Sequence, residues 1–245
     1  MTQELFRQDP YLNECEATVM AVTEQGIVLD RTVFYPLGGG QAGDSGLLVL
    51  EDGTTVRIAD TRKGKDPEGR PTPEVMHVSE PGQPVPEALR PGARLAARID
   101  WDRRHRLMRF HTTTHLLCHL VPQLVNGCSI TADYARLDFN MTEPLDKDAL
   151  TAGIARLVAE GHPVAIGSIT DEELDANPAL VKSMSVQPPR GTGRIRTIRI
   201  GSGQLIDFQP CGGTHVANTA EIGAVVVTKI EKKSASTRRV VLGFA

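Results

Sequence analysis

The sequence predicts an α+β protein in which a small antiparallel β-barrel precedes an α+β domain. Short β-branched segments at regular spacing fill the first hundred residues, without a long helical period. Amphipathic helical patterns begin only after Asp100. The chain has 245 residues, of which 40% are hydrophobic, so it can bury a substantial core. We therefore divide the chain into a β-barrel domain, residues 1–100, and an α+β domain, residues 101–245.

The barrel domain is predicted from short strands and the turns between them. Gln25-Gly26 and Asp52-Gly53 are turn signals, each with β-type residues on both sides. Seven of the sixteen prolines lie between Pro67 and Pro91, which predicts mostly loop around one short strand. The predicted strands are 16–22, 26–29, 47–50, 55–58, 74–78 and 93–99.

The second domain is predicted to hold two helices and four strands. Apolar residues follow a helical period from Asp102 to Val125, where Pro122 either bends or ends the helix. A second amphipathic helix is predicted from Leu145 to Glu160, with Gly161 as its stop. The predicted strands are 195–200, 204–208, 224–229 and 239–242.

Composition and charge exclude several classes of protein. No apolar run reaches the roughly 18 residues of a membrane span, and the N-terminus lacks a signal-peptide pattern. Four scattered cysteines do not make a disulfide scaffold, so we expect a soluble, cytoplasmic protein without a membrane partner. The net charge of −3 is uneven, at −6 over residues 1–100 and +6 from Arg190 onward. The basic end is either a phosphate-binding surface or a solvated face.

Two Cys/His pairs suggest a metal site. His111 and His115 lie four residues apart in the predicted helix, which places both imidazoles on one face. Cys211 and His215 enclose two glycines that allow both side chains to turn toward one ion. One cysteine and three histidines form a donor set that zinc prefers. The alternative is a set of buried histidines beside an inert thiol.

A glycine-rich segment in the barrel domain is a second candidate site. Gly38-Gly39-Gly40-Gln41 follows Phe-Tyr-Pro-Leu, and it matches neither the dinucleotide fingerprint nor the Walker loop. The glycines allow close approach of the backbone to a ligand, with Gln41 and Asp44 as polar contacts; the alternative is a barrel corner. Gly39, Gly40 and Gln41 are therefore candidate site residues.

Three motifs, at residues 34–41, 111–117 and 211–223, resemble the editing region of alanyl-tRNA synthetases. They read Phe-Tyr-Pro-Leu-Gly-Gly-Gly-Gln, His-Thr-Thr-Thr-His-Leu-Leu and Cys-Gly-Gly-Thr-His-Val-Ala-Asn-Thr-Ala-Glu-Ile-Gly. At this chain length the resemblance is to the freestanding alanyl-tRNA editing proteins, the AlaX group, over roughly residues 14–244. It implies the barrel and editing-domain fold shared with a threonyl-tRNA synthetase domain.

The resemblance also implies an activity and a set of residues. Family members hydrolyse tRNA(Ala) mischarged with serine, and some act on glycine. One zinc ion per chain would be held by His111, His115, Cys211 and His215. Thr32 would sense the serine hydroxyl. For the ester substrate that the resemblance implies, the backbone amides of residues 38–40 are candidates for holding the acyl oxyanion or the terminal ribose, so Gly39, Gly40 and Gln41 join Thr32 in the catalytic site. The basic tRNA-binding segment near the C-terminus would consist of Lys232, Lys233, Arg238 and Arg239.

Several mechanisms and two competing functions stay open from the sequence. Zinc could activate water, polarise the ester carbonyl or anchor the α-amino group of the substrate. A zinc- and tRNA-binding module without hydrolytic activity is the first alternative, and a zinc hydrolase of small esters or amides is the second. The sequence does not predict the oligomeric state, the reading of the acceptor stem or activity on Gly-tRNA(Ala).

Overall fold

The computed structural model describes residues 1–191 and 193–245, which form two compact units. The first unit contains residues 1–38 and 42–105, and the second contains residues 39–41 and 106–245. The division lies at His105, inside helix α1 (Trp101–Leu120), and the segment Gly39–Gln41 groups with the second unit. Each unit is described separately below.

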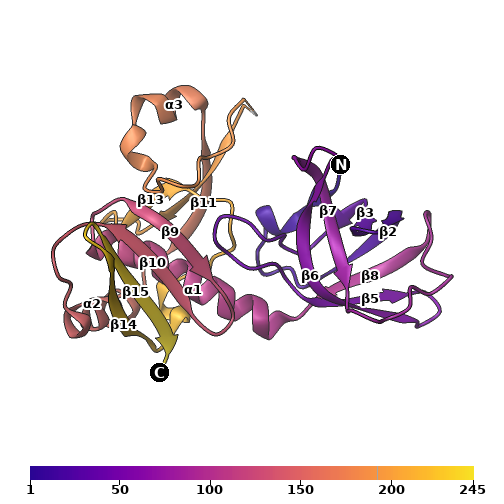
Figure 1. The fold of residues 1–245 in the computed structure, drawn as a ribbon, viewed down its shortest axis with the longest axis horizontal. Coiled ribbons are helices and arrows are strands. Elements are labelled where there is room, and N and C mark those ends of the chain that lie inside the picture. Colours follow the sequence, from indigo (N-terminus) through magenta and orange to yellow (C-terminus); the bar gives the residue numbers. More distant parts are fainter. Residues whose placement is uncertain (192) are drawn as a thin grey trace. The chain divides into compact units, whose positions relative to one another are not determined.

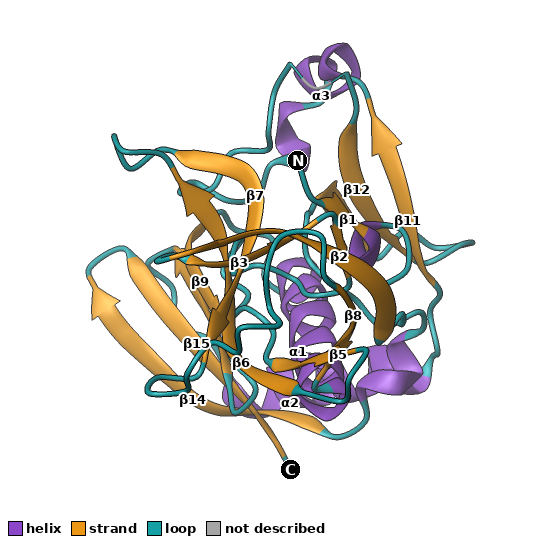
Figure 2. Cartoon of the chain, turned by 90° about the vertical axis from the view of Figure 1, so that its right-hand side faces the viewer, coloured by secondary structure: helices purple, strands orange, loops and turns teal. Residues whose placement is uncertain are grey.

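The first unit is built around six strands that pair in the order β2-β3-β7-β6-β5-β8 and close into a barrel (Figure 2). The ring closes because β2 pairs antiparallel with both β3 and β8. Apolar side chains such as Val19, Leu29, Leu48 and Val56 fill its core. The strand bounds are β2 Glu14–Thr23, β3 Gly26–Leu29, β5 Gly46–Leu50, β6 Thr55–Lys65, β7 Pro71–Ser79 and β8 Arg94–Ile99. The unit also holds β1 (Gln3–Glu4), η1 (Leu5–Arg7) and β4 (Arg31–Thr32).

The proline-rich segment of the first unit is more regular than the sequence predicts. β7 has nine residues, against the five predicted, and includes two of the prolines. Pro71 and Pro73 lie at its beginning, and Pro71 pairs with Lys65 after a register shift in the ladder. Proline is tolerated there because the start of a strand does not require every ladder donor.

A buried ion pair joins the start of α1 to the segment after the glycine-rich loop. Arg104 Nε donates to both carboxylate oxygens of Asp44 at 3.1 and 3.0 Å, and both side chains are fully buried. The remaining guanidinium nitrogens donate to the carbonyl oxygens of Pro10 at 3.0 Å and Val33 at 2.7 Å. Asp44 also accepts the amide of Tyr35 at 2.6 Å. The carboxylate of Asp44, a candidate ligand contact from the sequence, therefore bonds to Arg104 and Tyr35 within the first unit.

The second unit combines the rest of α1 with two antiparallel sheets. One sheet has the order β14-β15-β10-β9, and the other has the order β11-β12-β13. α1 packs on the larger sheet, since the rings of Phe110 and Phe244 lie 4.2 Å apart. α2 packs on β14 (Figure 1) and is capped by Asp146, which accepts the amides of Asp148 and Ala149. The bounds are β9 Val125–Ile130, β10 Ala135–Asn140, α2 Lys147–Ala159, β11 Val164–Ile169, α3 Asp171–Ala176, η2 Pro178–Leu180, β12 Ile195–Ile200, β13 Asp207–Pro210, η3 Thr219–Ile222, β14 Val225–Ser234 and β15 Thr237–Phe244.

The first predicted helix is present but shorter than predicted. It ends at Leu120, because Pro122 cannot continue the hydrogen-bond pattern, and β9 begins at Val125. Strands β9, β10 and β11 were not predicted, and β13 lies three residues later than the predicted strand 204–208. Over the described residues, 1–191 and 193–245, no helix combines the length and apolarity that a bilayer crossing requires.

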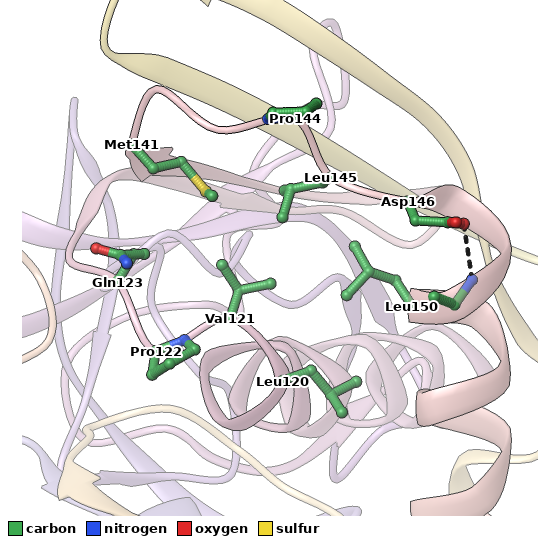
Figure 3. Close-up of a pocket in the computed structure, with 10 residues that line it drawn as sticks. Leu120, Val121, Pro122, Gln123, Met141, Pro144, Leu145, Asp146 and Leu150 are labelled. Carbon is green, nitrogen blue, oxygen red and sulfur yellow. Dashed lines mark hydrogen bonds between the residues drawn. The ribbon is translucent and has the colours of Figure 1, made fainter.

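A groove of about 220 Å³ lies between the end of α1 and the start of α2 (Figure 3). Leu120, Val121, Leu145 and Leu150 give it a largely apolar lining. None of the site residues predicted from the sequence lines this groove.

Candidate metal centre

Four predicted metal ligands meet in the second unit. His111 and His115 lie on α1, and Cys211 and His215 lie on the loop that follows β13. One ligand atom from each residue lies within 4.8 Å of all the others. Cys211 Sγ is 3.4 Å from His111 Nε2 and 3.3 Å from His215 Nε2. The predicted convergence of the two Cys/His pairs is confirmed.

The local sequence explains the shape of the cysteine loop. Arg196, on the neighbouring strand β12, donates to the carbonyl oxygens of Cys211 at 2.6 Å and Gly213 at 3.0 Å. A Cβ atom on Gly213 would lie 2.1 Å from His111 Cε1, closer than any real contact. Glycine is required at this position because the imidazole of His111 packs directly on the loop backbone.

Each of the three histidines has an oxygen acceptor at Nδ1. His111 Nδ1 lies 2.7 Å from Gln41 Oε1, and His115 Nδ1 lies 2.7 Å from Asp207 Oδ2. His215 Nδ1 lies 3.2 Å from the hydroxyl of Thr112, whose own proton is donated to the carbonyl of Met108. These contacts assign the ring proton to Nδ1 in all three residues. In a neutral imidazole with its proton on Nδ1, the lone pair lies on Nε2.

The donor set fits a tetrahedral zinc ion. A ligand sulfur and nitrogen on one tetrahedral zinc are about 3.5 Å apart, from bond lengths of about 2.3 and 2.05 Å. The two distances from Cys211 Sγ to Nε2 atoms are close to that value, at 3.4 and 3.3 Å. Although burial raises the pKa of Cys211, the imidazoles of His111 and His215 hold it well below its usual value. A thiolate and neutral imidazole nitrogens are donors that suit a zinc ion.

Asp207 is a site residue that the sequence interpretation missed. Although burial raises its pKa, hydrogen bonds and charge from His115 and Lys182 lower the pKa to about 2. Lys182 forms an ion pair with Oδ1, and Gln209 donates to Oδ2 at 2.8 Å. The available signal is an acidic residue just before Cys211, but the sequence analysis gives Asp207 no role at the metal site.

Gln41, predicted as a catalytic residue, is fully buried beside His111. Its Oε1 also accepts the amide of Thr214 at 3.1 Å, and its Nε2 donates to the hydroxyl of Thr214 at 2.8 Å. These contacts fix the orientation of the side-chain amide, with oxygen toward His111. In the second unit, Gln41 therefore contacts the predicted metal ligand His111 and the Cys-Gly-Gly-Thr-His loop.

The glycines before Gln41 are required by the backbone. Gly39 and Gly40 have φ angles of 58° and 86°, in the left-handed region that favours glycine. A Cβ atom on Gly40 would lie 3.0 Å from the side chain of Cys128, and the Gly40 carbonyl accepts the Ile130 amide at 2.7 Å. The predicted close approach of backbone therefore occurs, and in the second unit the neighbour is strand β9.

Thr32, the predicted serine sensor, lies fully buried in the first unit. His77 Nδ1 lies 2.9 Å from the carbonyl of Ile27, so His77 Nε2 accepts from the Thr32 hydroxyl at 2.8 Å. The Thr32 oxygen also accepts the amide of Phe34 at 3.0 Å. The Thr32 hydroxyl therefore donates its proton to His77, and its oxygen has one further lone pair that can accept a hydrogen bond.

The predicted tRNA-binding residues lie on the β14–β15 hairpin but differ in exposure. Lys232 and Lys233 are exposed. Arg238 is buried, and its guanidinium donates to backbone carbonyls, including those of Thr142 and Ser234. Arg239 donates to both carboxylate oxygens of Asp138, at 2.7 and 2.9 Å. Only the two lysines present their charges fully to solvent.

Two family models match parts of this chain. Residues 195–241 match the family model of the threonyl and alanyl tRNA synthetase second additional domain, and residues 7–103 match that of class II (A) tRNA synthetases. The first match contains Cys211 and His215. Residues 195–241 are therefore similar to part of the second additional domain of these synthetases.

Relatives that match almost the whole chain show which family it belongs to. The alanyl-tRNA editing protein AlaX-M of Methanosarcina barkeri is 35% identical, over 98% of this chain and 97% of its own length. That of Saccharolobus solfataricus is 34% identical, over 98% of both chains. The alanine–tRNA ligase of Metallosphaera sedula is 34% identical over 94% of this chain, which spans 25% of the ligase. The chain belongs to the alanyl-tRNA editing protein family.

Proposed function

We propose that this protein is a zinc-dependent trans-editing deacylase that hydrolyses Ser-tRNA(Ala), with Gly-tRNA(Ala) as a second candidate substrate. The observation that carries the proposal is the cluster of four ligand atoms within 4.8 Å, in a chain similar over its full length to alanyl-tRNA editing proteins. Its place of action is the cytoplasm, where tRNA is charged and used.

The proposed site holds one zinc ion per chain on His111, His115, Cys211 and His215. When bound, zinc supplies a Lewis acid, which suits hydrolysis of an already activated aminoacyl ester. Gln41 holds His111 through Nδ1 and orients that ligand. The backbone amides of Gly39 and Gly40 are proposed to hold the acyl oxygen or the terminal ribose. In this proposal residues 101–245 supply the metal ligands, and residues 1–100 supply Thr32 and the glycine-rich segment.

Thr32 is proposed to recognise serine, on the strength of its place in the Thr-Val-Phe-Tyr-Pro sequence. Because its proton is committed to His77, the oxygen of Thr32 can only accept a further hydrogen bond. A serine hydroxyl can donate that bond, whereas alanine and glycine cannot. Recognition by an acceptor of this kind favours serine over alanine by the free energy of one buried hydrogen bond.

The test is a comparison of deacylation rates on Ser-tRNA(Ala), Gly-tRNA(Ala) and Ala-tRNA(Ala), with and without a zinc chelator. We expect rapid hydrolysis of the serine ester, loss of activity in the chelator and recovery on adding zinc. In the same assay, Thr32→Val is expected to lower the serine-over-alanine rate ratio by about 5- to 50-fold. Zinc and tRNA binding without hydrolysis of any of the three esters would instead identify a binding module.

Lys232 and Lys233 are proposed to contact tRNA phosphates, with Arg238 and Arg239 shaping the hairpin that presents them. Both lysines are exposed, whereas the guanidinium groups of the arginines bond within the sheet. An exposed ammonium can release counterions from a phosphate backbone, and this release makes binding depend on salt.

Replacing both lysines, as Lys232→Ala with Lys233→Ala, should weaken tRNA binding and lower its logarithmic salt slope by about 1 to 2. Zinc content should not change. The matched control is Lys147→Ala with Arg156→Ala, which removes two exposed charges from α2. Equal weakening by both double variants would show that net charge, and not the hairpin, determines binding.

A further inference from the structure

We propose that Asp207 is a positioning residue of the metal centre, which sets the tautomer and orientation of His115. Lys182 and Gln209 hold the carboxylate in place for this role. The inference rests on the proposed function only in that the four-residue cluster binds zinc. It assigns a role to three side chains that the sequence analysis did not place in the site.

The contacts of Asp207 show that its carboxylate accepts from every neighbour. Oδ2 lies 2.7 Å from His115 Nδ1 and 2.8 Å from Gln209 Nε2, and Oδ1 receives the ammonium of Lys182. An ionised carboxylate has no proton to give, so Nδ1 of His115 must carry the proton. In the neutral imidazole the lone pair is then on Nε2, and Nε2 is the atom that would bind a metal ion.

Gln209 supports the carboxylate and does not compete for the imidazole. Its Nε2 is 3.2 Å from His115 Nδ1, but two donors cannot bond to each other. The amide therefore donates to Asp207 Oδ2, at the shorter distance of 2.8 Å. His115 has one acceptor at Nδ1, and that acceptor is Asp207.

The backbone of Lys182 is anchored in the second unit, and its ammonium forms an ion pair with Asp207. The carbonyl of Lys182 accepts the amide of Val125 at 2.8 Å, and the amide of Met184 donates back to Val125 at 2.9 Å. These two bonds fasten the segment to the start of β9. The ion pair therefore links Asp207 to a second strand of the unit.

Asp207 differs from the other two Nδ1 acceptors because it is charged. Gln41 and Thr112 are neutral partners of His111 and His215. A carboxylate makes a stronger hydrogen bond to an imidazole N–H and increases the basicity of the opposite nitrogen. We therefore expect removal of Asp207 to weaken zinc binding without removing a ligand.

The experiment measures zinc affinity and the rate of zinc loss to a chelating dye for Asp207→Ala and Asp207→Asn. We expect Asp207→Ala to weaken zinc binding by about 10- to 100-fold. Asp207→Asn keeps the side-chain volume and one acceptor oxygen, so it should lower zinc affinity less than Asp207→Ala. The absorption spectrum of the cobalt-substituted protein should also shift in Asp207→Ala, because the geometry at His115 changes. This readout does not depend on catalysis.

Glu160→Ala is the matched control. Glu160 accepts from His162 Nε2 at 2.6 Å, so it forms a carboxylate–histidine pair of the same chemistry outside the four-ligand cluster. Its zinc affinity and cobalt spectrum should equal those of the unsubstituted protein. An equal loss in Glu160→Ala, or zinc affinity of Asp207→Ala within twofold of the unsubstituted protein, would overturn the inference.

Failure of this inference can be told apart from failure of the proposed function. If the unsubstituted protein binds zinc and hydrolyses Ser-tRNA(Ala), but Asp207→Ala and Asp207→Asn keep full zinc affinity, the role of Asp207 is refuted alone. If zinc affinity depends on Asp207 but no mischarged tRNA is hydrolysed, the proposed function fails and the positioning role stands. Far-UV circular dichroism of Asp207→Asn, which preserves side-chain volume, separates a local effect from loss of the fold.

Discussion

Cys211→Ala is expected to abolish hydrolysis of Ser-tRNA(Ala) and to weaken zinc binding by more than about 100-fold, because it removes a metal ligand. His111→Ala removes the ligand that α1 supplies, so it should cause the same losses of hydrolysis and of zinc binding. Zinc content by elemental analysis and deacylation rates measure the two effects. Each of these substitutions should lower zinc affinity more than replacement of an Nδ1 acceptor does, because replacing an acceptor leaves all four ligands present.

Cys15→Ala is the control for the cysteine substitution. Cys15 is a free thiol in the barrel, and burial raises its pKa to about 11. Its removal should leave zinc content and deacylation unchanged. Full zinc occupancy and activity in Cys211→Ala would mean that the four-residue cluster is not the catalytic metal site.

Arg104→Met is expected to destabilise the first unit by about 3–5 kcal/mol, since it leaves the buried carboxylate of Asp44 without its partner. The substitution also removes donors to the carbonyls of Pro10 and Val33. Urea unfolding followed by tryptophan fluorescence measures this effect on the first unit. Trp101 is the single tryptophan of the chain and belongs to that unit.

Arg98→Met provides the comparison for a surface ion pair. Arg98 pairs with Glu14 at 2.9 Å, and both side chains are largely exposed, at 51% and 43%. Exposed pairs of this kind contribute about 0–1 kcal/mol, so the unfolding midpoint should move little. If Arg104→Met moves the midpoint no further than Arg98→Met, the buried pair does not hold the unit together.

The four metal ligands could be predicted because their signals are local. Two histidines four residues apart on a helix, and Cys-Gly-Gly-Thr-His in a loop, each require only short-range geometry. The helix itself was predicted because its apolar period is long. Its end was less certain, since Pro122 permits either a bend or a stop, and the structure ends the helix at Leu120.

The residues that orient the ligands could not be predicted, because each reaches its histidine across a long sequence separation. Asp207 is 92 residues from His115, and Gln41 is 70 residues from His111. The residues near each histidine in the sequence do not indicate which distant side chain contacts its ring. The sequence analysis gives Asp207 no role at the metal site, and it predicts a substrate contact for Gln41 because Gln41 follows three glycines.

The grouping of Gly39–Gln41 with the second unit has a consequence for dissecting this chain. A fragment beginning at Arg106 would contain every ligand, yet it would lack Gln41, the acceptor for His111 Nδ1. Its His111 could then carry the proton on either nitrogen, and one of these forms cannot bind a metal through Nε2. A transplantable version of this centre therefore has to be assembled from two separate stretches of the polypeptide.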